Sequence, residues 1–258
     1  MKNKVTVTTL KKKKQNNQKI TALTAYDYCT ASILDELEFD IILVGDSLGM
    51  VVLGYDSTIP VTVEEIVHHS KAVTRAVKRS FVVADMPFMS YQASIEDAVR
   101  NAGRLVKQGN ANAVKLEGGE EIAETVTKLV ESGIPVMGHV GLRPQSVNKT
   151  GGYKVQGKTK ADADKIISDV KILEKSGCFA IVLECVPHEL AKEITEILDI
   201  PTIGIGAGKD CDGQILVVND MLGMSDKPVP SFVKKYADLN SIYRQAFQAY
   251  KKDVESNC

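Results

Sequence analysis

Eight runs of apolar and mostly β-branched residues recur along this chain of 258 residues. The runs are unbroken rather than alternating, which is typical of strands that are covered on both faces, as in parallel sheets. This recurrence is the strongest constraint on the fold, because each run needs a neighbouring strand and a covering helix. The candidate strands are residues 19–26, 41–46, 80–88, 113–118, 134–142, 179–186, 200–208 and 214–220.

Helical patterns separate most of these runs. The sequences TVEE at Thr62 and SIED at Ser94 place a hydroxyl three residues before an acid, which is typical of a capped helix start. Helices are expected from there to about Arg79 and Gln108. Strands that alternate with helices over about 250 residues predict an α/β fold, a single-domain (β/α)8 TIM barrel over residues 1–258. An open doubly wound sheet is the alternative, but no G-x-G-x-x-G motif follows the first strand.

Charge and cysteine content exclude several classes of function. The formal net charge is −1 and the chain has no basic stripe, so nucleic-acid binding is not expected. The five cysteines are odd in number and show no CxxC spacing, which favours neither a disulfide framework nor a zinc site. A reducing, cytoplasmic location fits this pattern best.

The first residues contain no continuous apolar segment, and no window approaches the roughly 18 apolar residues of a membrane span. Neither a signal peptide nor a membrane partner is therefore expected. Residues 1–18 are polar and include the run Lys11–Lys14. A short run of like charges predicts a solvated, mobile N-terminal arm.

Charged residues lie at or near the carboxyl ends of the predicted strands, which otherwise consist mainly of apolar residues. Parallel strands bring these ends to one rim, which is where barrel enzymes assemble their chemistry. The residues concerned are Asp46, Asp85, Lys115, Glu117, His139 and Glu184.

Three of these side chains, Asp46, Asp85 and Glu117, form an all-oxygen set suited to a hard cation such as Mg²⁺. Because Mg²⁺ commonly takes one or two protein carboxylates and keeps several waters, one of the three is free to act through water. Lys115 would then receive an anionic group of the substrate. Glu184 is not needed for the metal, which makes it the candidate general base.

Each of these residues alone also has a structural interpretation. An acid at a strand end is often a helix cap or an ion-pair partner, and Lys115 and Glu117 would suit a structural pair on one strand face. His139 alone would suit a hydrogen-bonded core histidine. Their coincidence on successive strands favours a functional site.

Longer motifs in the chain are more specific than the barrel pattern. Between about Ile20 and Leu239 they resemble, in order, those of ketopantoate hydroxymethyltransferase. The matching segments are LTAYDY, ILVGDSLGMVVLGYDSTIPVT, VVADMPFMSYQ, AVKLEGG, GHVGLRPQSV, GGYKVQGK, LECVP, IPTIGIGAG and CDGQILVVNDMLG.

This resemblance implies a (β/α)8 barrel that depends on Mg²⁺. It also implies transfer of a one-carbon unit from 5,10-methylenetetrahydrofolate, as co-substrate, to 3-methyl-2-oxobutanoate, giving 2-dehydropantoate. The family further implies a homo-oligomer, commonly a decamer. By motif, the implied roles are metal ligation by Asp46 and Asp85 with Glu117 as a further acid, substrate contact by Ser47, Lys115 and His139, and general-base catalysis by Glu184.

Two rival interpretations remain. One is a Mg²⁺ barrel related to phosphoenolpyruvate mutase or isocitrate lyase, which would share the metal and the oxo acid but not the folate. Those lyases typically use a cysteine-bearing loop, and no cysteine lies between Arg143 and Thr159. The other is a catalytically silent barrel that binds a metabolite or serves as a scaffold, and the intact acid set argues against it.

Overall fold

The computed structural model describes residues 3–152, 154–225 and 228–256. Its parallel strands close into a barrel in chain order, with β8 returning to pair with β1. The strands are β1 (Ile20–Thr24), β2 (Ile41–Val44), β3 (Phe81–Asp85), β4 (Ala113–Glu117), β5 (Val136–Gly141), β6 (Ala180–Glu184), β7 (Thr202–Ile205) and β8 (Gly213–Gln214). The predicted (β/α)8 architecture is therefore confirmed.

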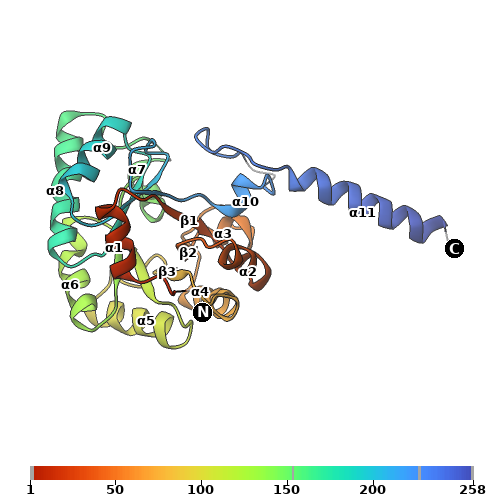
Figure 1. Ribbon diagram of the computed structural model, residues 1–258, viewed down its shortest axis with the longest axis horizontal. Helices are drawn as coiled ribbons and strands as arrows, with labels where there is room; N and C mark the ends of the chain where they lie inside the picture. The colour runs from red at the N-terminus through yellow and green to blue at the C-terminus, as the bar shows by residue number, and fades with distance from the viewer. Residues whose placement is uncertain (1–2, 153, 226–227, 257–258) are drawn as a thin grey trace. The chain divides into compact units, whose positions relative to one another are not determined.

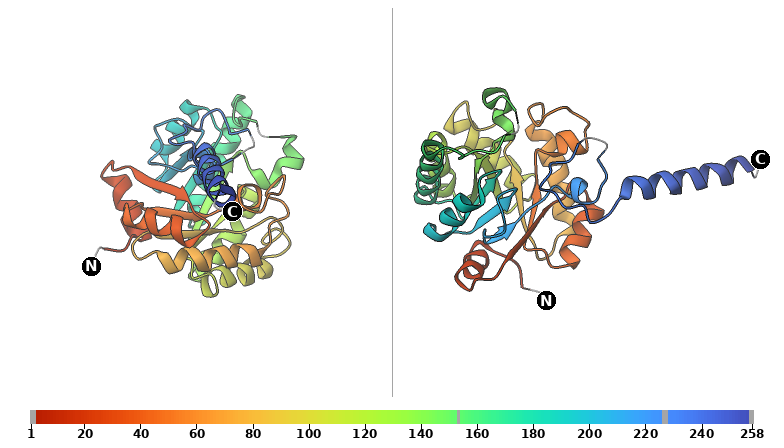
Figure 2. Two further views of the ribbon diagram at one scale, coloured as in Figure 1. Left: turned by 90° about the vertical axis from the view of Figure 1, so that its right-hand side faces the viewer. Right: turned by 90° about the horizontal axis from the view of Figure 1, so that it is seen from above.

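Helices surround these strands, as Figure 1 shows for the part of the chain that forms the barrel. The two views in Figure 2 show the same shell of helices around the strands. The longer helices of the shell are α2 (Tyr28–Glu36), α4 (Val63–Ala76), α5 (Ile95–Lys107), α6 (Ala123–Glu131), α8 (Lys160–Lys175) and α9 (His188–Ile197). Shorter ones follow particular strands: α3 (Leu48–Val51), the 3-10 turns η1 (Glu120–Ile122) and η2 (Pro144–Ser146), and α7 (Val147–Thr150).

The predicted helix starts are confirmed. The Thr62 hydroxyl accepts a hydrogen bond from the Glu65 backbone N–H at 3.2 Å, and the Glu65 carboxylate accepts one from the Thr62 N–H at 2.7 Å. At α5 only one of these two bonds is present: the Ser94 hydroxyl accepts from the Asp97 backbone N–H at 3.1 Å. Both caps satisfy N–H groups that have no partner within their helix, which fixes where α4 and α5 begin.

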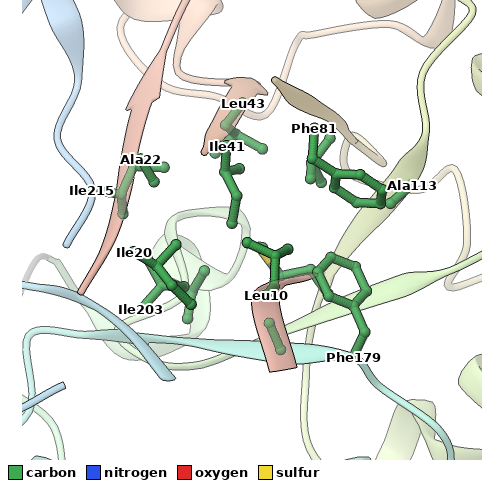
Figure 3. Packing of buried hydrophobic residues seen from close by; sticks show 14 of the residues in the cluster. Leu10, Ile20, Ala22, Ile41, Leu43, Phe81, Ala113, Phe179, Ile203 and Ile215 are labelled. Atoms are coloured by element: carbon green, nitrogen blue, oxygen red, sulfur yellow. The ribbon is translucent and has the colours of Figure 1, made fainter. Parts of the chain in front are cut away.

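The N-terminal segment differs from the sequence expectation. Instead of a mobile, solvated arm, residues Val7–Gln15 form helix α1, which begins at the N-cap Thr6. Leu10 of this helix is fully buried. In Figure 3 it lies among apolar side chains that come from the amino-terminal parts of the strands, including Ile20, Ile41 and Phe81. Helix α1 therefore closes that end of the barrel.

Two lysines of the run hold α1 in place. Lys13 Nζ lies 2.6 Å from Asp40 Oδ2, and Asp40 is nearly fully buried. Lys14 Nζ lies 2.8 Å from Asp212 Oδ2. The run of lysines is therefore divided, because Lys11 and Lys12 are exposed while Lys13 and Lys14 are partly buried ion-pair partners.

Replacing Leu10 by alanine tests this role of α1. We expect Leu10→Ala to lower the free energy of unfolding by about 2–5 kcal/mol, because it leaves a cavity in a packed core. Lys11→Ala on the exposed face of the same helix should change it by less than about 0.5 kcal/mol. Urea denaturation of both variants measures the difference. Equal effects of the two substitutions would show that α1 does not close the barrel in solution.

The chain divides into two compact units, Met1–Ile215 and Leu216–Cys258. The first contains the whole barrel. The second contains α10 (Val218–Met221) and α11 (Leu239–Ser256), and backbone hydrogen bonds from Tyr236 to Met221 and from Leu239 to Leu222 hold it together. The sequence pattern predicts neither helix, and the prediction of a strand over residues 214–220 is wrong at its end, because residues 218–220 belong to α10. Among the described residues, no helix combines the length and the hydropathy that a membrane span requires.

Candidate active site

The charged residues predicted at the rim lie together at the carboxyl ends of the strands. Asp85, Glu117 and Glu184 are the last residues of β3, β4 and β6, and Asp46 follows β2 by two residues. The strand register places Asp85 beside Lys115, and Glu117 beside His139. The side chain of Glu184 is 15% exposed, and the other five are nearly fully buried.

Lys115 lies at the centre of this cluster. Its Nζ is 2.9 Å from Asp85 Oδ1 and 3.2 Å from His139 Nδ1. Burial alone would lower the pKa of Lys115, but the carboxylates of Asp85, Glu117 and Asp46 outweigh burial and raise it. Lys115 is therefore a permanent positive charge at the bottom of the site.

His139 is a neutral imidazole between Lys115 and Glu184. Burial and the charge of Lys115 lower its pKa well below the usual value. Because an ammonium group only donates hydrogen bonds, Nδ1 accepts from Lys115, and the ring proton is on Nε2. His139 Nε2 lies 3.2 Å from Glu184 Oε2, although the two groups are not aligned as a hydrogen bond. Such contacts commonly tighten when substrate binds.

Three acids of the site, Asp46, Glu117 and Glu184, have raised pKa values and hold protons more tightly than ordinary carboxyl groups. Burial raises the pKa of Glu184 to about 7. Burial also raises the pKa of Glu117 to about 8, with Lys115 acting in the opposite direction. The pKa of Asp46 is raised well above its usual value by burial and by the nearby charges of Asp85 and Glu117. With all four acids ionised, the site would carry more negative charge than Lys115 can balance.

The segment around Asp46 brings β2 against β3. The backbone N–H of Asp46 donates to Asp85 Oδ2 at 2.9 Å. Gly45 permits this approach, because a Cβ at that position would lie 2.8 Å from Ser47 Oγ and 3.3 Å from Asp85 Oδ2. The Ser47 hydroxyl is 2.8 Å from the Tyr26 hydroxyl, which orients it next to the acid cluster.

Two neutral residues that the sequence analysis missed complete the site. Gln145, in η2, donates from Nε2 to Asp46 Oδ2 at 2.8 Å, and its backbone N–H donates to Glu117 Oε2 at 3.1 Å. Tyr91 accepts at its hydroxyl from the Glu117 N–H at 3.1 Å and lies 2.8 Å from Gln145 Oε1. The available signals were the motifs VVADMPFMSYQ and GHVGLRPQSV, which contain these residues, and for Gln145 the segment after β5, which is too long for an ordinary turn.

This donor set fits a divalent cation. Asp46 and Asp85 are buried carboxylates on adjacent strand ends, and Asp85 Oδ1 is the ion-pair partner of Lys115 at 2.9 Å. A hard cation prefers such oxygen ligands and would offset the surplus negative charge. Among the described residues, no group of three or more acidic, histidine or cysteine side chains is arranged to ligate a metal. The arrangement therefore suits two direct carboxylate ligands, with water or substrate oxygens for the rest.

A closed parallel barrel with acids and a lysine on its carboxyl rim defines the chain as a (β/α)8-barrel enzyme. Solved structures with this fold include a phosphonopyruvate hydrolase in complex with oxalate and Mg²⁺, with a TM-score of 0.66 and 12% identity over 97% of this chain and 88% of that chain. A 2,3-dimethylmalate lyase has a TM-score of 0.65 and 15% identity over 97% and 86%. At these identities the likeness concerns the fold alone.

The family model of ketopantoate hydroxymethyltransferase matches residues 4–258. The 3-methyl-2-oxobutanoate hydroxymethyltransferase of Carboxydothermus hydrogenoformans is 62% identical over 98% of this chain and 91% of its own length. That of a Thermoanaerobacter species is 61% identical over 99% and 93%. The chain therefore belongs to the ketopantoate hydroxymethyltransferase family, whose members are transferases of pantothenate biosynthesis.

Proposed function

We propose that this enzyme transfers a hydroxymethyl group from 5,10-methylenetetrahydrofolate to 3-methyl-2-oxobutanoate, giving 2-dehydropantoate, with Mg²⁺ as cofactor. The observation that carries the proposal is the buried cluster of Asp46, Asp85, Lys115, Glu117 and Glu184 on the rim of a chain in this family. In the balanced reaction, C3 of the oxo acid loses a proton and forms a bond to the methylene carbon. Water supplies the hydroxyl oxygen, and tetrahydrofolate leaves.

Asp46 and Asp85 would hold the metal, with Glu117 ligating directly or through water. When bound, Mg²⁺ would withdraw electron density from the carbonyl group of the oxo acid and so acidify the neighbouring C–H. A phosphonopyruvate hydrolase with the same fold has been solved in complex with oxalate and Mg²⁺, so this fold can hold a small dicarboxylate together with a divalent cation.

Lys115, Ser47 and His139 would contact the oxo acid. The ammonium group of Lys115 stays charged because its carboxylate neighbours raise its pKa, so it can receive the substrate carboxylate or keto oxygen. Nε2 of the neutral His139 lies 3.2 Å from Glu184 Oε2, where it can orient either the base or the substrate once substrate binding tightens the contact. The hydroxyl of Ser47, held by Tyr26, is an additional donor.

Glu184 would remove the proton from C3. It lies at the end of β6, on the far side of His139 from Lys115, and outside the group of acids assigned to the metal. Burial raises its pKa to about 7, so the carboxylate is a stronger base than a solvated one and is still ionised in a large fraction of molecules near neutral pH.

The folate donor would occupy a cavity of about 410 Å³ beside the rim. Its walls come from the end of β5, the segments after β4 and β5, and α8. Gly141 lines the cavity and pairs in register with Glu184, which places the cavity next to the proposed base. Its volume lies within the range of about 300–1,000 Å³ that is typical of small-molecule sites.

The Lys115→Met substitution distinguishes residues that bind the oxo acid from residues that bind the folate donor. We expect it to weaken binding of 3-methyl-2-oxobutanoate by about 10- to 100-fold, because a hydrogen bond between charged groups contributes about 1.5–3 kcal/mol. Binding of tetrahydrofolate should stay within about threefold, because Lys115 does not line the donor cavity. Titration calorimetry measures both. Lys128→Met, at an exposed position of α6, is the matched control. If binding of the folate is weakened more than binding of the oxo acid, Lys115 contacts the folate donor and not the oxo acid.

We also propose a cytoplasmic homo-oligomer, a decamer as the resemblance implies. Helix α11 supports assembly, because none of its residues is buried and its exposed apolar side chains recur at spacings of four, three and four residues. These residues are Tyr243, Phe247, Tyr250 and Val254. A repeat of this kind forms an apolar seam along one face of a helix, which is typical of a surface that packs against a partner. Sedimentation equilibrium measures the subunit number.

The proposed reaction is tested by detecting 2-dehydropantoate by NMR after incubation with both substrates and Mg²⁺. Product is expected only when the oxo acid, the folate donor and the divalent cation are all present. Conversion of the oxo acid without folate would favour the lyase-like alternative. Binding of the oxo acid without any turnover would favour the catalytically silent barrel.

A further inference from the structure

Gln145 links more parts of the site than any of the predicted residues. It lies in η2, in the segment that follows β5, and it is the one buried residue of that turn. Its side chain and backbone make hydrogen bonds with residues after β2, after β3 and at the end of β4. The partners are Asp46 Oδ2 at 2.8 Å, the Met86 carbonyl at 2.9 Å, Glu117 Oε2 at 3.1 Å, the Tyr91 hydroxyl at 2.8 Å and Gln92 Nε2 at 3.2 Å.

These partners fix the orientation of the Gln145 amide. The amide nitrogen faces two pure acceptors, the Asp46 carboxylate and the Met86 carbonyl, so it must donate to both. The amide oxygen faces two donors, the Tyr91 hydroxyl and the Gln92 side-chain amide. Flipping the amide would set its oxygen against the Asp46 carboxylate and the Met86 carbonyl and break both of those hydrogen bonds, so Gln145 holds its partners in one arrangement.

The hydrogen bonds of Gln145 fix the orientation of two carboxylates of the site. Gln145 Nε2 occupies Oδ2 of Asp46 and fixes the rotation of that carboxylate, while the Gln145 backbone N–H does the same for Glu117 through Oε2. A partner that orients a ligating carboxylate in this way typically contributes 10- to 100-fold to metal affinity. The backbone contact further requires the segment after β5 to be in place.

We propose that Gln145 is a positioning residue that couples ordering of the segment after β5 to cation binding by Asp46 and Glu117. The inference rests on the metal site of the proposed function. Because coupling between two equilibria is reciprocal, a bound cation stabilises the ordered segment as much as the ordered segment strengthens cation binding. The same segment supplies Arg143 and Lys149 to the donor cavity, so the coupling would prepare that cavity when the metal is loaded.

The test compares Gln145→Met with Gln92→Met. Methionine keeps the length of the side chain but removes the amide, and Gln92 is an exposed residue that touches Gln145 and not the carboxylates. Titration of Mg²⁺ alone by calorimetry should give about 10- to 100-fold weaker binding for Gln145→Met and less than about threefold for Gln92→Met. Gln145→Asn, which keeps an amide on a shorter side chain, provides a second variant and should weaken binding to an intermediate degree.

Hydrogen–deuterium exchange of residues 142–152 distinguishes the coupling from a role in stability alone, because only the coupling makes the exchange rates of these amides depend on Mg²⁺. Mg²⁺ should slow exchange of these amides in the wild-type chain and in Gln92→Met, but not in Gln145→Met. Unchanged Mg²⁺ affinity of both Gln145 variants, or equal metal-dependent protection in all chains, would overturn the coupling while leaving the proposed function intact. A wild-type chain that does not bind Mg²⁺ would overturn both.

Discussion

Replacing Glu184 by glutamine is expected to lower turnover by about 10²- to 10⁴-fold, which is the usual contribution of a positioned general base. Glutamine keeps the size of the side chain but cannot accept a proton from carbon. Binding of the oxo acid with Mg²⁺ should survive, because Glu184 lies outside the group of acids assigned to the metal. Steady-state assays of product formation, together with calorimetric binding of the oxo acid, measure the two effects separately.

The matched control is Glu189→Gln on the exposed surface of α9, which should keep turnover within about twofold. The pH profile provides a second check. Because Glu184 must be ionised to act and burial raises its pKa to about 7, wild-type turnover should fall about tenfold for each pH unit below that value. A Glu184→Gln enzyme that keeps more than a tenth of the wild-type turnover would contradict its role as the base.

Asp46→Asn and Asp85→Asn should each abolish Mg²⁺-dependent binding of the oxo acid, with a loss of more than about 100-fold, because each removes a charged ligand. Asparagine is preferable to alanine at position 85. The Asp85 carboxylate is 2.9 Å from buried Lys115, and deleting one partner of a buried ion pair commonly costs about 3–5 kcal/mol of stability. With asparagine, the one side-chain oxygen can still accept from Lys115 or from the Asp46 N–H, and the volume of the side chain is kept.

Calorimetric titration of the oxo acid at saturating Mg²⁺ measures this loss, and circular dichroism verifies the fold of each variant. Asp199→Asn, at an exposed position before β7, is the control and should bind like the wild type. Retention of tight, metal-dependent binding by both site variants would require a different set of ligands, with Glu117 the first residue to re-examine.

The fold and the charged residues of the rim could be predicted from the sequence for one physical reason. Strands buried on both faces leave unbroken apolar runs, so an acid at the end of such a run, as at Asp85 or Glu184, is conspicuous. The eighth strand was harder to delimit, since only Gly213 and Gln214 pair in the barrel although the apolar run extends to Val218.

The role of α1 could not be inferred from local pattern. Its apolar contact depends on one residue, Leu10, and its charges are matched by Asp40 and Asp212, which lie far along the chain. A run of lysines looks the same in sequence whether water or buried acids surround it. Only the closed barrel brings these acids beneath the helix.

Gln145 and Tyr91 were missed for a similar reason. Neutral polar residues in connecting segments carry no periodic signal, and their importance lies in partners that are distant in sequence. The contact from Gln145 to Asp46 spans 99 residues and that to Glu117 spans 28. The path of the segment after β5 determines both contacts, and that path follows from tertiary packing.

The central claim is that Glu184 removes the C3 proton of 3-methyl-2-oxobutanoate, and that a cation held by the acidic rim would make this proton acidic enough to be removed. Its most direct test is exchange of that proton with deuterated water, followed by NMR with Mg²⁺ and without folate. The wild-type enzyme should exchange the proton, and both chelation of the metal and Glu184→Gln should stop the exchange. Exchange at an undiminished rate in the variant, or in the absence of any divalent cation, would contradict the claim.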